Sequence, residues 1–237
     1  MHASTTSLGR NRILAALPTD NYRRLQPYLT PVELTHGMVL YEMGKPIEYV
    51  YFPMSAVVSL VIPMEDGSTV EVGLVGNAGM AGTVALVGEE TATCRAVVQI
   101  PDLAIRAPLA VIKREFSRRG EFQKQLLRYM LVLLKEVEQT VACNASHTVE
   151  ERLARWLLMC REHVQSDELK LTPGIISKIF APSRATVSAA TTNLLSEGLI
   201  EYRHGSVRII DRRRLEKFSC DCYRAVKEES FHLHDQY

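Results

Sequence analysis

The spacing of apolar residues changes along the chain, and each change marks a new kind of element. Residues 11–29 have helical spacing, but Pro18 and Pro27 interrupt it, which predicts a cap of short helices. From Thr30 to about Arg106, short apolar runs alternate with turn sequences rich in Gly, Asn and Asp. Many short strands at such close spacing predict an antiparallel β-roll or sandwich. The predicted strands cover residues 39–41, 49–52, 56–62, 70–75 and 94–100.

Helical spacing returns at Leu109 and continues to about Cys143. Two apolar stripes run along this helix. One has coiled-coil spacing and is predicted to be the dimerisation seam; it comprises Leu126, Met130, Leu133, Val137 and Thr140. The other comprises Leu127, Leu131 and Leu134. Because one partner buries only one stripe, we expect the helix to pack on its own β-domain and on a second copy, as a two-fold homodimer. The alternative is a helix buried wholly within a monomer.

A capping box follows the long helix. In Thr148-Val149-Glu150-Glu151, the threonine hydroxyl can accept from the backbone of Glu151, whose carboxylate can reach back. A new helix is therefore predicted to start at 148, with residues 144–147 as the hinge. The expected domains are a β-roll sensor with N-terminal helices (1–107), a connector and dimerisation helix (108–147), and a C-terminal domain (148–237).

Residues 171–211 have the pattern of a winged helix-turn-helix. Thr172-Pro173 opens a short helix over 174–180, and Ser183 caps a second helix that Gly198 ends. Two strands, 199–202 and 206–210, then flank a turn. Residues 178–214 contain seven basic and three acidic residues, whereas the whole chain has a net charge of +1. Such a local excess of positive charge suits a phosphate-binding surface.

Composition and length agree with a folded protein of two domains. The chain has 237 residues, of which 46% are hydrophobic and 23% charged. We expect no membrane segment, because no apolar run approaches the roughly 20 residues needed to span a bilayer. No secretory signal is visible, so a cytoplasmic location is expected. The five cysteines are scattered and odd in number, which favours reduced thiols.

The C-terminal pattern resembles the Crp/Fnr family of bacterial transcription regulators. The residues that carry the resemblance are 183–187, read as Ser-Arg-Ala-Thr-Val, and 194–200, read as Leu-Leu-Ser-Glu-Gly-Leu-Ile. The resemblance implies an α+β fold: an antiparallel β-roll of the cyclic-nucleotide-binding type, a long dimerisation helix and a winged helix-turn-helix. It also implies a homodimer that binds double-stranded DNA and contacts RNA polymerase.

The resemblance implies roles for residues of the second helix and the wing. Arg184 would read a guanine edge in the major groove. The other predicted DNA-binding residues are Ser183, Thr186, Ser188, Arg203 and His204. Ala185 and Ala189 stand where cyclic-AMP-binding members carry a glutamate and a second arginine, so we expect a different operator.

The effector site departs from the family pattern. Cyclic-nucleotide binders hold the ligand with a Gly-Glu pair and an Arg-Ser pair, but here Thr83 follows Gly82 and alanine follows Arg95. Cyclic AMP is therefore not expected, and Arg95 is a weak candidate for an anion site. The absence of any cysteine before Cys94 argues against an N-terminal iron–sulfur cluster, and a lone His36 argues against haem. The sequence predicts no cofactor, and it does not identify an effector.

Cys220-Asp221-Cys222, with His232 and His234, offers four possible zinc ligands near the end of the sequence. We favour a structural interpretation without metal, in which a last helix over 213–229 buries the cysteines as small apolar groups. The sequence leaves two alternative functions open. A ligand-binding regulatory module without DNA binding would leave the basic helix and wing without a role. An enzyme on a cupin-like roll would need a cluster of metal ligands, and the roll offers only His36.

Overall fold

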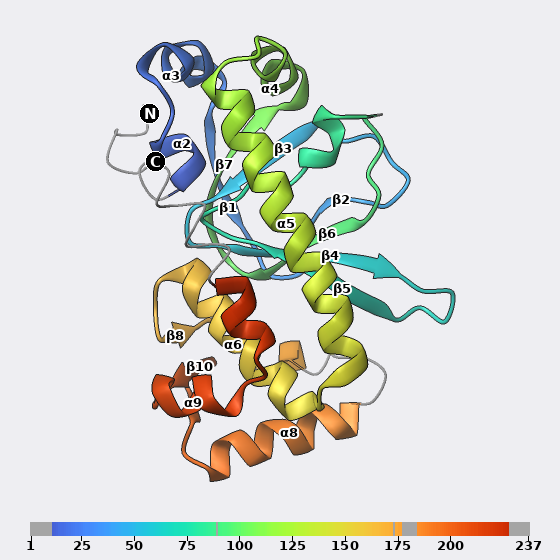
Figure 1. Ribbon diagram of the computed structural model, residues 1–237, viewed down its shortest axis with the longest axis vertical. Coiled ribbons are helices and arrows are strands. Elements are labelled where there is room, and N and C mark those ends of the chain that lie inside the picture. Colours follow the sequence, from blue (N-terminus) through green and yellow to red (C-terminus); the bar gives the residue numbers. More distant parts are fainter. Residues whose placement is uncertain (1–10, 89, 173, 177–183, 228–237) are drawn as a thin grey trace.

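The computed structural model describes residues 11–88, 90–172, 174–176 and 184–227. A β-roll with a helical cap and a smaller C-terminal domain lie along one long helix, α5 (Figure 1). This architecture confirms the predicted fold class. Within the described residues, no helix combines the length and the apolar character that crossing a membrane requires.

Two antiparallel sheets form the roll. The first contains β1 (Thr30–Leu34), β7 (Asp102–Pro108) and β3 (Tyr49–Pro53), in that order. The second contains β2 (Val39–Tyr41), β6 (Arg95–Ile100), β4 (Val57–Pro63) and β5 (Thr69–Val75). The cap consists of α2 (Arg12–Ala15), α3 (Thr19–Leu25) and the 3₁₀ turn η1 (Gln26–Tyr28), while a second 3₁₀ turn, η2 (Thr83–Leu86), follows β5. The cap is thus a set of short helices, as predicted: Pro18 separates α2 from α3, and Pro27 lies within η1.

Alternation along the strands fills the roll interior. On β6, Ala96 and Val98 are buried in the core, whereas Arg95, Val97 and Gln99 point to the other face. Two glycines allow close approach between elements. A side-chain carbon at Gly79 would lie 2.3 Å from the Tyr129 hydroxyl, and one at Gly76 would lie 2.3 Å from His163. Glycine is thus needed at these two positions for the turn between β5 and η2 to lie against α5 and α6 (Val149–Val164).

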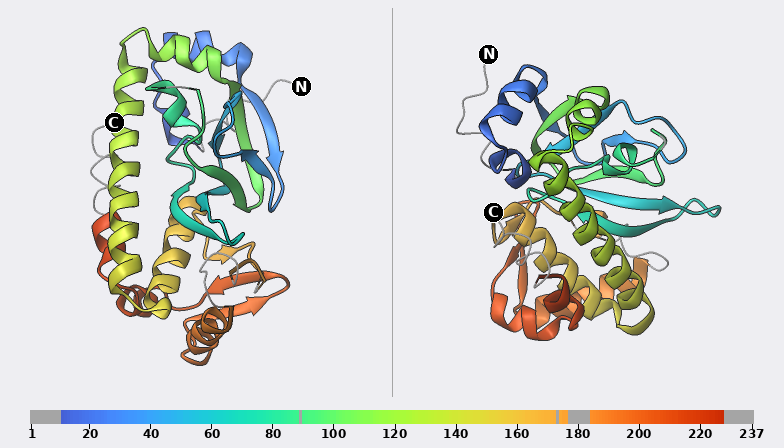
Figure 2. Two further views of the ribbon diagram at one scale, coloured as in Figure 1. Left: turned by 90° about the vertical axis from the view of Figure 1, so that its right-hand side faces the viewer. Right: turned by 45° about the horizontal axis from the view of Figure 1, so that its top comes forward.

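The expected continuous helix from Leu109 is two helices, α4 (Leu109–Phe116) and α5 (Glu121–Ser146). Arg119 adopts a left-handed conformation with φ of 56°, and Gly120 is extended just before α5 begins. This sharp turn lets both helices pack on the roll, which one straight helix could not do. Figure 2 shows α5 running past the roll and down beside the C-terminal domain.

Helix α6 begins at the predicted capping box. The Thr148 hydroxyl accepts from the Glu151 backbone, and the Glu151 carboxylate accepts from the Thr148 backbone at 2.8 Å. After α6 come β8 (Glu168–Leu169), α8 (Arg184–Ser196), β9 (Ile200–Arg203), β10 (Ser206–Ile209) and α9 (Arg212–Phe218). The predicted last helix over 213–229 is not continuous: α9 ends at Phe218, Ser219 is extended, and helical structure resumes over 222–227.

The two domains share apolar packing. Val57, Leu74 and Ile100 of the roll belong to the same buried cluster as Leu157 of α6. On the polar side of this contact, Arg155 of α6 donates to the Thr140 hydroxyl of α5 at 3.0 Å. The roll and the C-terminal domain are thus joined by side chains as well as by α5.

Candidate nucleic-acid interface

Helix α8 has one buried face and one exposed face. Val187, Ala190 and Leu194 are buried against the C-terminal core, which confirms their predicted inward orientation. The exposed face carries small or short polar residues: Ala185, Thr186, Ser188, Ala189 and Thr192. A helix with such short side chains can approach another surface closely. Arg184 starts α8, whereas Ser183 and the helix predicted over 174–180 lie outside the described residues, apart from residues 174–176, which are helical.

The wing is a tight hairpin of β9 and β10, in which Ser206 pairs with Arg203. His204 and Gly205 form its two-residue turn, with φ of 47° and 83°. Two successive positive φ values are the mark of the turn type that suits the twist of a hairpin, and glycine adopts them without strain. Arg203 and His204 are exposed at the tip. The hairpin therefore presents a cation and an imidazole to solvent.

Ion pairs with acidic side chains neutralise part of the positive charge that the sequence shows in residues 178–214. Arg208 pairs with Glu201 at 3.7 Å, and Arg214 pairs with Glu197 at 3.2 Å. Arg212 similarly contacts Glu162 at 3.1 Å and Glu216 at 2.9 Å. Among the described residues, no acidic side chain forms an ion pair with Arg203 or Arg213. The available positive charge is thus smaller than the sequence count, and part of it is at the wing tip.

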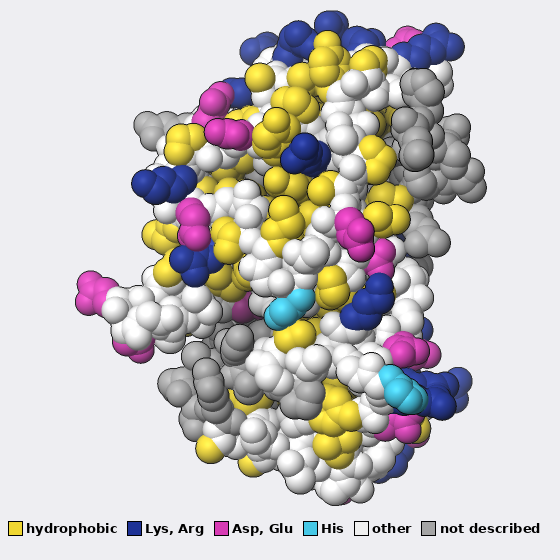
Figure 3. Space-filling view, turned by 180° about the vertical axis from the view of Figure 1, so that it is seen from behind, with side chains coloured by type: hydrophobic (Ala, Val, Ile, Leu, Met, Phe, Trp, Pro, Cys, Tyr) yellow, Lys and Arg dark blue, Asp and Glu magenta, His cyan; other side chains and the backbone are white. Residues whose placement is uncertain are grey.

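A second basic region lies at the far end of the molecule. Figure 3 shows Lys and Arg side chains gathered at the top, the end at which α3 and α4 lie. Arg23 and Arg118 contribute there, with side chains 73% and 54% exposed. Charge alone therefore does not single out a candidate nucleic-acid surface; the shape of α8 and the wing is also needed.

The structure divides the stripes of α5 differently from the prediction. Leu126 is wholly buried in the roll core and is unavailable to a second chain, which corrects its assignment to the dimerisation seam. Met130 and Leu133 pack partly on the same core, and Val137 lies near Gly73 of β5. Thr140 accepts a hydrogen bond from Arg155. The solvent-facing stripe is the second one: Leu127, Leu131 and Leu134 are 46%, 54% and 53% exposed.

The predicted effector residues do not form one site. Gly82 has φ of 99° and packs against Val50 of the roll core, and the side chain of Thr83 is buried. Arg95 points to the other face of β6, where it pairs with Glu42 at 2.6 Å. It lines a groove with His36 and Gln99, and neither Gly82 nor Thr83 lines that groove. His36 itself bonds through a ring nitrogen to the Gln99 carbonyl at 3.0 Å.

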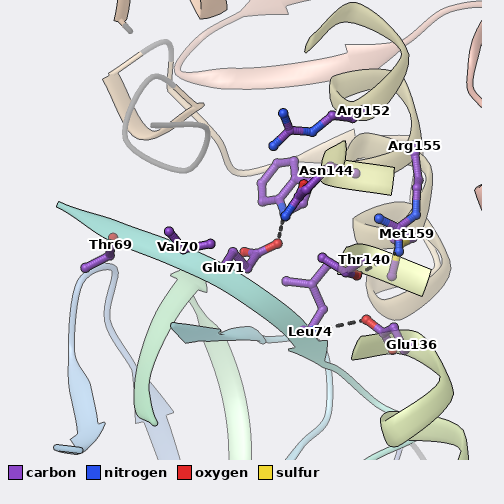
Figure 4. Close-up of a pocket in the computed structure, with 12 residues that line it drawn as sticks. Thr69, Val70, Glu71, Leu74, Glu136, Thr140, Asn144, Arg152, Arg155 and Met159 are labelled. Atoms are coloured by element: carbon purple, nitrogen blue, oxygen red, sulfur yellow. Dashed lines mark hydrogen bonds between the residues drawn. The ribbon is translucent and has the colours of Figure 1, made fainter. Parts of the chain in front are cut away.

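A polar pocket at the junction of the domains was not anticipated from the sequence. Figure 4 shows Glu71 reaching from β5 toward α6, and Glu136 reaching from α5 to the backbone of Leu74. Trp156 donates its indole N–H to Glu71 at 2.8 Å, Ser59 donates its hydroxyl to the same carboxylate, and the Leu74 amide donates to Glu136 at 3.1 Å. Burial raises the pKa of both carboxyls to about 7.

Replacing both carboxyls by amides, as Glu71→Gln with Glu136→Gln, is expected to stabilise the protein relative to wild type at pH 8 but not at pH 4.5. Because burial raises each folded-state pKa above its usual 4.5, the native state holds protons that the unfolded state releases, and wild-type stability falls as pH rises from about 4.5 to 7. The expected gain at pH 8 is on the order of 2 kcal/mol per carboxyl.

Urea unfolding, followed by fluorescence of Trp156, the single tryptophan, measures this difference. The comparison with wild type cancels the opposite contribution of His163, whose pKa is lowered to about 4 by burial. Glu33→Gln, at an exposed position on β1, is the control. A variant whose advantage over wild type is the same at both pH values would contradict the assignment.

The C-terminal cysteines are buried, as predicted, but they have partners that the sequence analysis missed. Cys220 and Cys222 lie beside Cys143 and His147, at the end of α5. His232 and His234, the partners considered from the sequence, lie outside the described residues. The sequence signal for this cluster was the four-residue spacing of Cys143 and His147, which places both side chains on one helix face. That spacing does not indicate that Cys220 joins them.

Comparison with known families agrees with both domains. A cyclic nucleotide-binding domain model matches residues 31–118, and a Crp-like helix-turn-helix domain model matches residues 151–218. A comparison with curated protein sequences found no match.

Several solved structures share the fold. FixK2 from Bradyrhizobium japonicum is 17% identical with a TM-score of 0.67, over 81% of this chain and 98% of that one. A CRP-family transcriptional regulator from Thermus thermophilus is 20% identical with a TM-score of 0.65, over 79% of this chain and 96% of that one. A CRP/FNR-family regulator from the same organism is 23% identical with a TM-score of 0.63, over 80% and 98%. The two matched domain models, in this order, show a cyclic nucleotide-binding domain followed by a Crp-like helix-turn-helix domain, and the solved structures share this fold.

Proposed function

We propose that the protein works as a homodimer that reads a specific operator by placing α8 of each subunit in the major groove. The observation that carries the proposal is the exposed face of α8, whose short side chains follow Arg184 and lie next to a wing with Arg203 and His204 at its tip. The short side chains would let the helix enter the groove, while the wing would contact the phosphate backbone.

The dimer would form along α5 through Leu127, Leu131 and Leu134 rather than through the stripe first assigned to it. Two parallel copies of α5 would then set the separation of the two α8 helices, which must match major grooves about 34 Å apart. A signal received by the roll would reach the DNA-binding domain along α5 and through the packing of Val57, Leu74 and Ile100 against α6. In regulating transcription, the DNA-bound dimer would contact RNA polymerase.

Titration of fluorescent genomic and random DNA fragments over a range of salt concentrations tests the proposal. We expect a steep fall of affinity with salt for all fragments, together with a residual preference for particular sequences of about 10³-fold or more. No binding tighter than about 10⁻⁴ M at low salt would overturn it. The sequences enriched by binding then define the operator for the variants below.

A further inference from the structure

Three cysteines and one histidine meet where the long helix ends. Cys143 and His147 come from the last turn of α5 and the residue that caps it. Cys220 lies in the break after α9, and Cys222 is the first of the helical residues 222–227. Their sulfur and nitrogen atoms all lie within 4.8 Å of one another. The break in the predicted last helix is what turns both C-terminal thiols toward α5.

The spacing of these atoms suits a single tetrahedral ion. Bond lengths of roughly 2.3 Å from zinc to sulfur and roughly 2.0–2.1 Å to nitrogen give tetrahedron edges of about 3.8 Å between sulfurs and about 3.6 Å from sulfur to nitrogen. The Cys143 and Cys220 sulfurs are 3.5 Å apart, and the Cys222 sulfur is 3.6 Å from Nδ1 of His147. An iron–sulfur cluster would put iron and sulfide between its thiolates and would need ligand atoms further apart.

The groups around the cluster orient the ligands. Nε2 of His147 lies 3.4 Å from a carboxylate oxygen of Asp221, an arrangement that leaves Nδ1 to face the thiols. Metal-bound histidines commonly have such a carboxylate partner on the other ring nitrogen. Gln139 donates from Nε2 to the Cys222 sulfur at 3.0 Å.

We propose that Cys143, His147, Cys220 and Cys222 bind a structural zinc ion that fastens the end of α5 to the C-terminal segment of the DNA-binding domain. Three cysteines and one histidine with no position left for water are a ligand set of structural zinc sites. The ion would fix the angle at which the DNA-binding domain leaves the long helix. Zinc binding itself does not depend on DNA binding, so the two proposals stand or fall separately.

The test uses the full-length protein, purified under reducing conditions without chelators. We expect native mass spectrometry to find one zinc ion per chain. Titration of the metal-free protein with Co²⁺ should saturate at one equivalent and give the visible absorption of tetrahedral, thiolate-bound cobalt. Less than one equivalent of either metal bound by the reduced wild-type protein, an iron–sulfur cluster, or a Cys143–Cys220 disulfide in the freshly reduced protein would each overturn the proposal.

Variants test the individual ligands through competition with a chromophoric zinc chelator. Cys222→Ser should lower the zinc affinity by more than about 100-fold, because a thiolate ligand is lost. Asp221→Asn should lower it by about 10-fold through the orientation of His147; this side chain is 74% exposed, so the fold should tolerate the change. Cys160→Ser, at a buried cysteine outside the cluster, is the control. Wild-type affinity in both Cys222→Ser and Asp221→Asn would contradict the proposed ligand set.

Discussion

Arg184→Ala is expected to weaken binding to the selected operator by about 10- to 100-fold per half-site while changing the affinity for random DNA only a few-fold. A bidentate contact between an arginine and a guanine contributes roughly 1–3 kcal/mol of discrimination against the other bases. That discrimination is present only on the cognate sequence, so its loss should bring the operator and random affinities together. Binding is measured by fluorescence anisotropy at several salt concentrations.

Arg203→Ala is the informative comparison, because it removes the same charge from the tip of the wing. If Arg203 contacts phosphate, its loss should weaken binding to all sequences about equally and make the salt dependence shallower by about one counterion. Arg23→Ala, at the opposite end of the molecule, controls for net charge. Equal losses on operator and random DNA for Arg184→Ala would show that this residue is not a base reader.

The sequence predicted best where a local rule determines the structure. The capping box at Thr148, the turn at His204-Gly205 and the inward positions Val187, Ala190 and Leu194 all follow from residue types at fixed spacing. These features need no knowledge of the rest of the fold. They also define the winged helix-turn-helix, which explains why the type of function could be predicted.

The predictions failed where two distant segments decide the outcome. Periodicity revealed two apolar stripes on α5, but it could not say which one the roll covers, and Leu126 was assigned to the wrong side. The turn at Arg119 and Gly120 is set by the need of α4 and α5 to pack on the same roll. Likewise, Cys143 and Cys220 meet only because α9 ends early, and the Trp156–Glu71 contact depends on how the domains dock.

Leu131→Asp is expected to convert the dimer to a monomer at micromolar concentrations. In a two-fold interface along α5, one substitution removes two leucines and brings two carboxylates toward each other. Each buried leucine contributes roughly 1.5–3 kcal/mol, so a loss of at least about 4 kcal/mol should raise the dimer dissociation constant by about 10³-fold or more. Sedimentation velocity over a concentration series measures the change.

Operator affinity should fall when the dimer is lost. A monomer binds only one half-site, so it lacks the added affinity that comes from linking two recognition helices in one dimer. Leu103→Asp is the matched control: it introduces the same charge at a leucine of β7 that is 43% exposed, away from α5. It should leave both the dimer and operator affinity as in wild type. If Leu131→Asp remained dimeric while Leu103→Asp dissociated, the interface would have to lie on the roll, and α5 could not set the spacing of the two α8 helices.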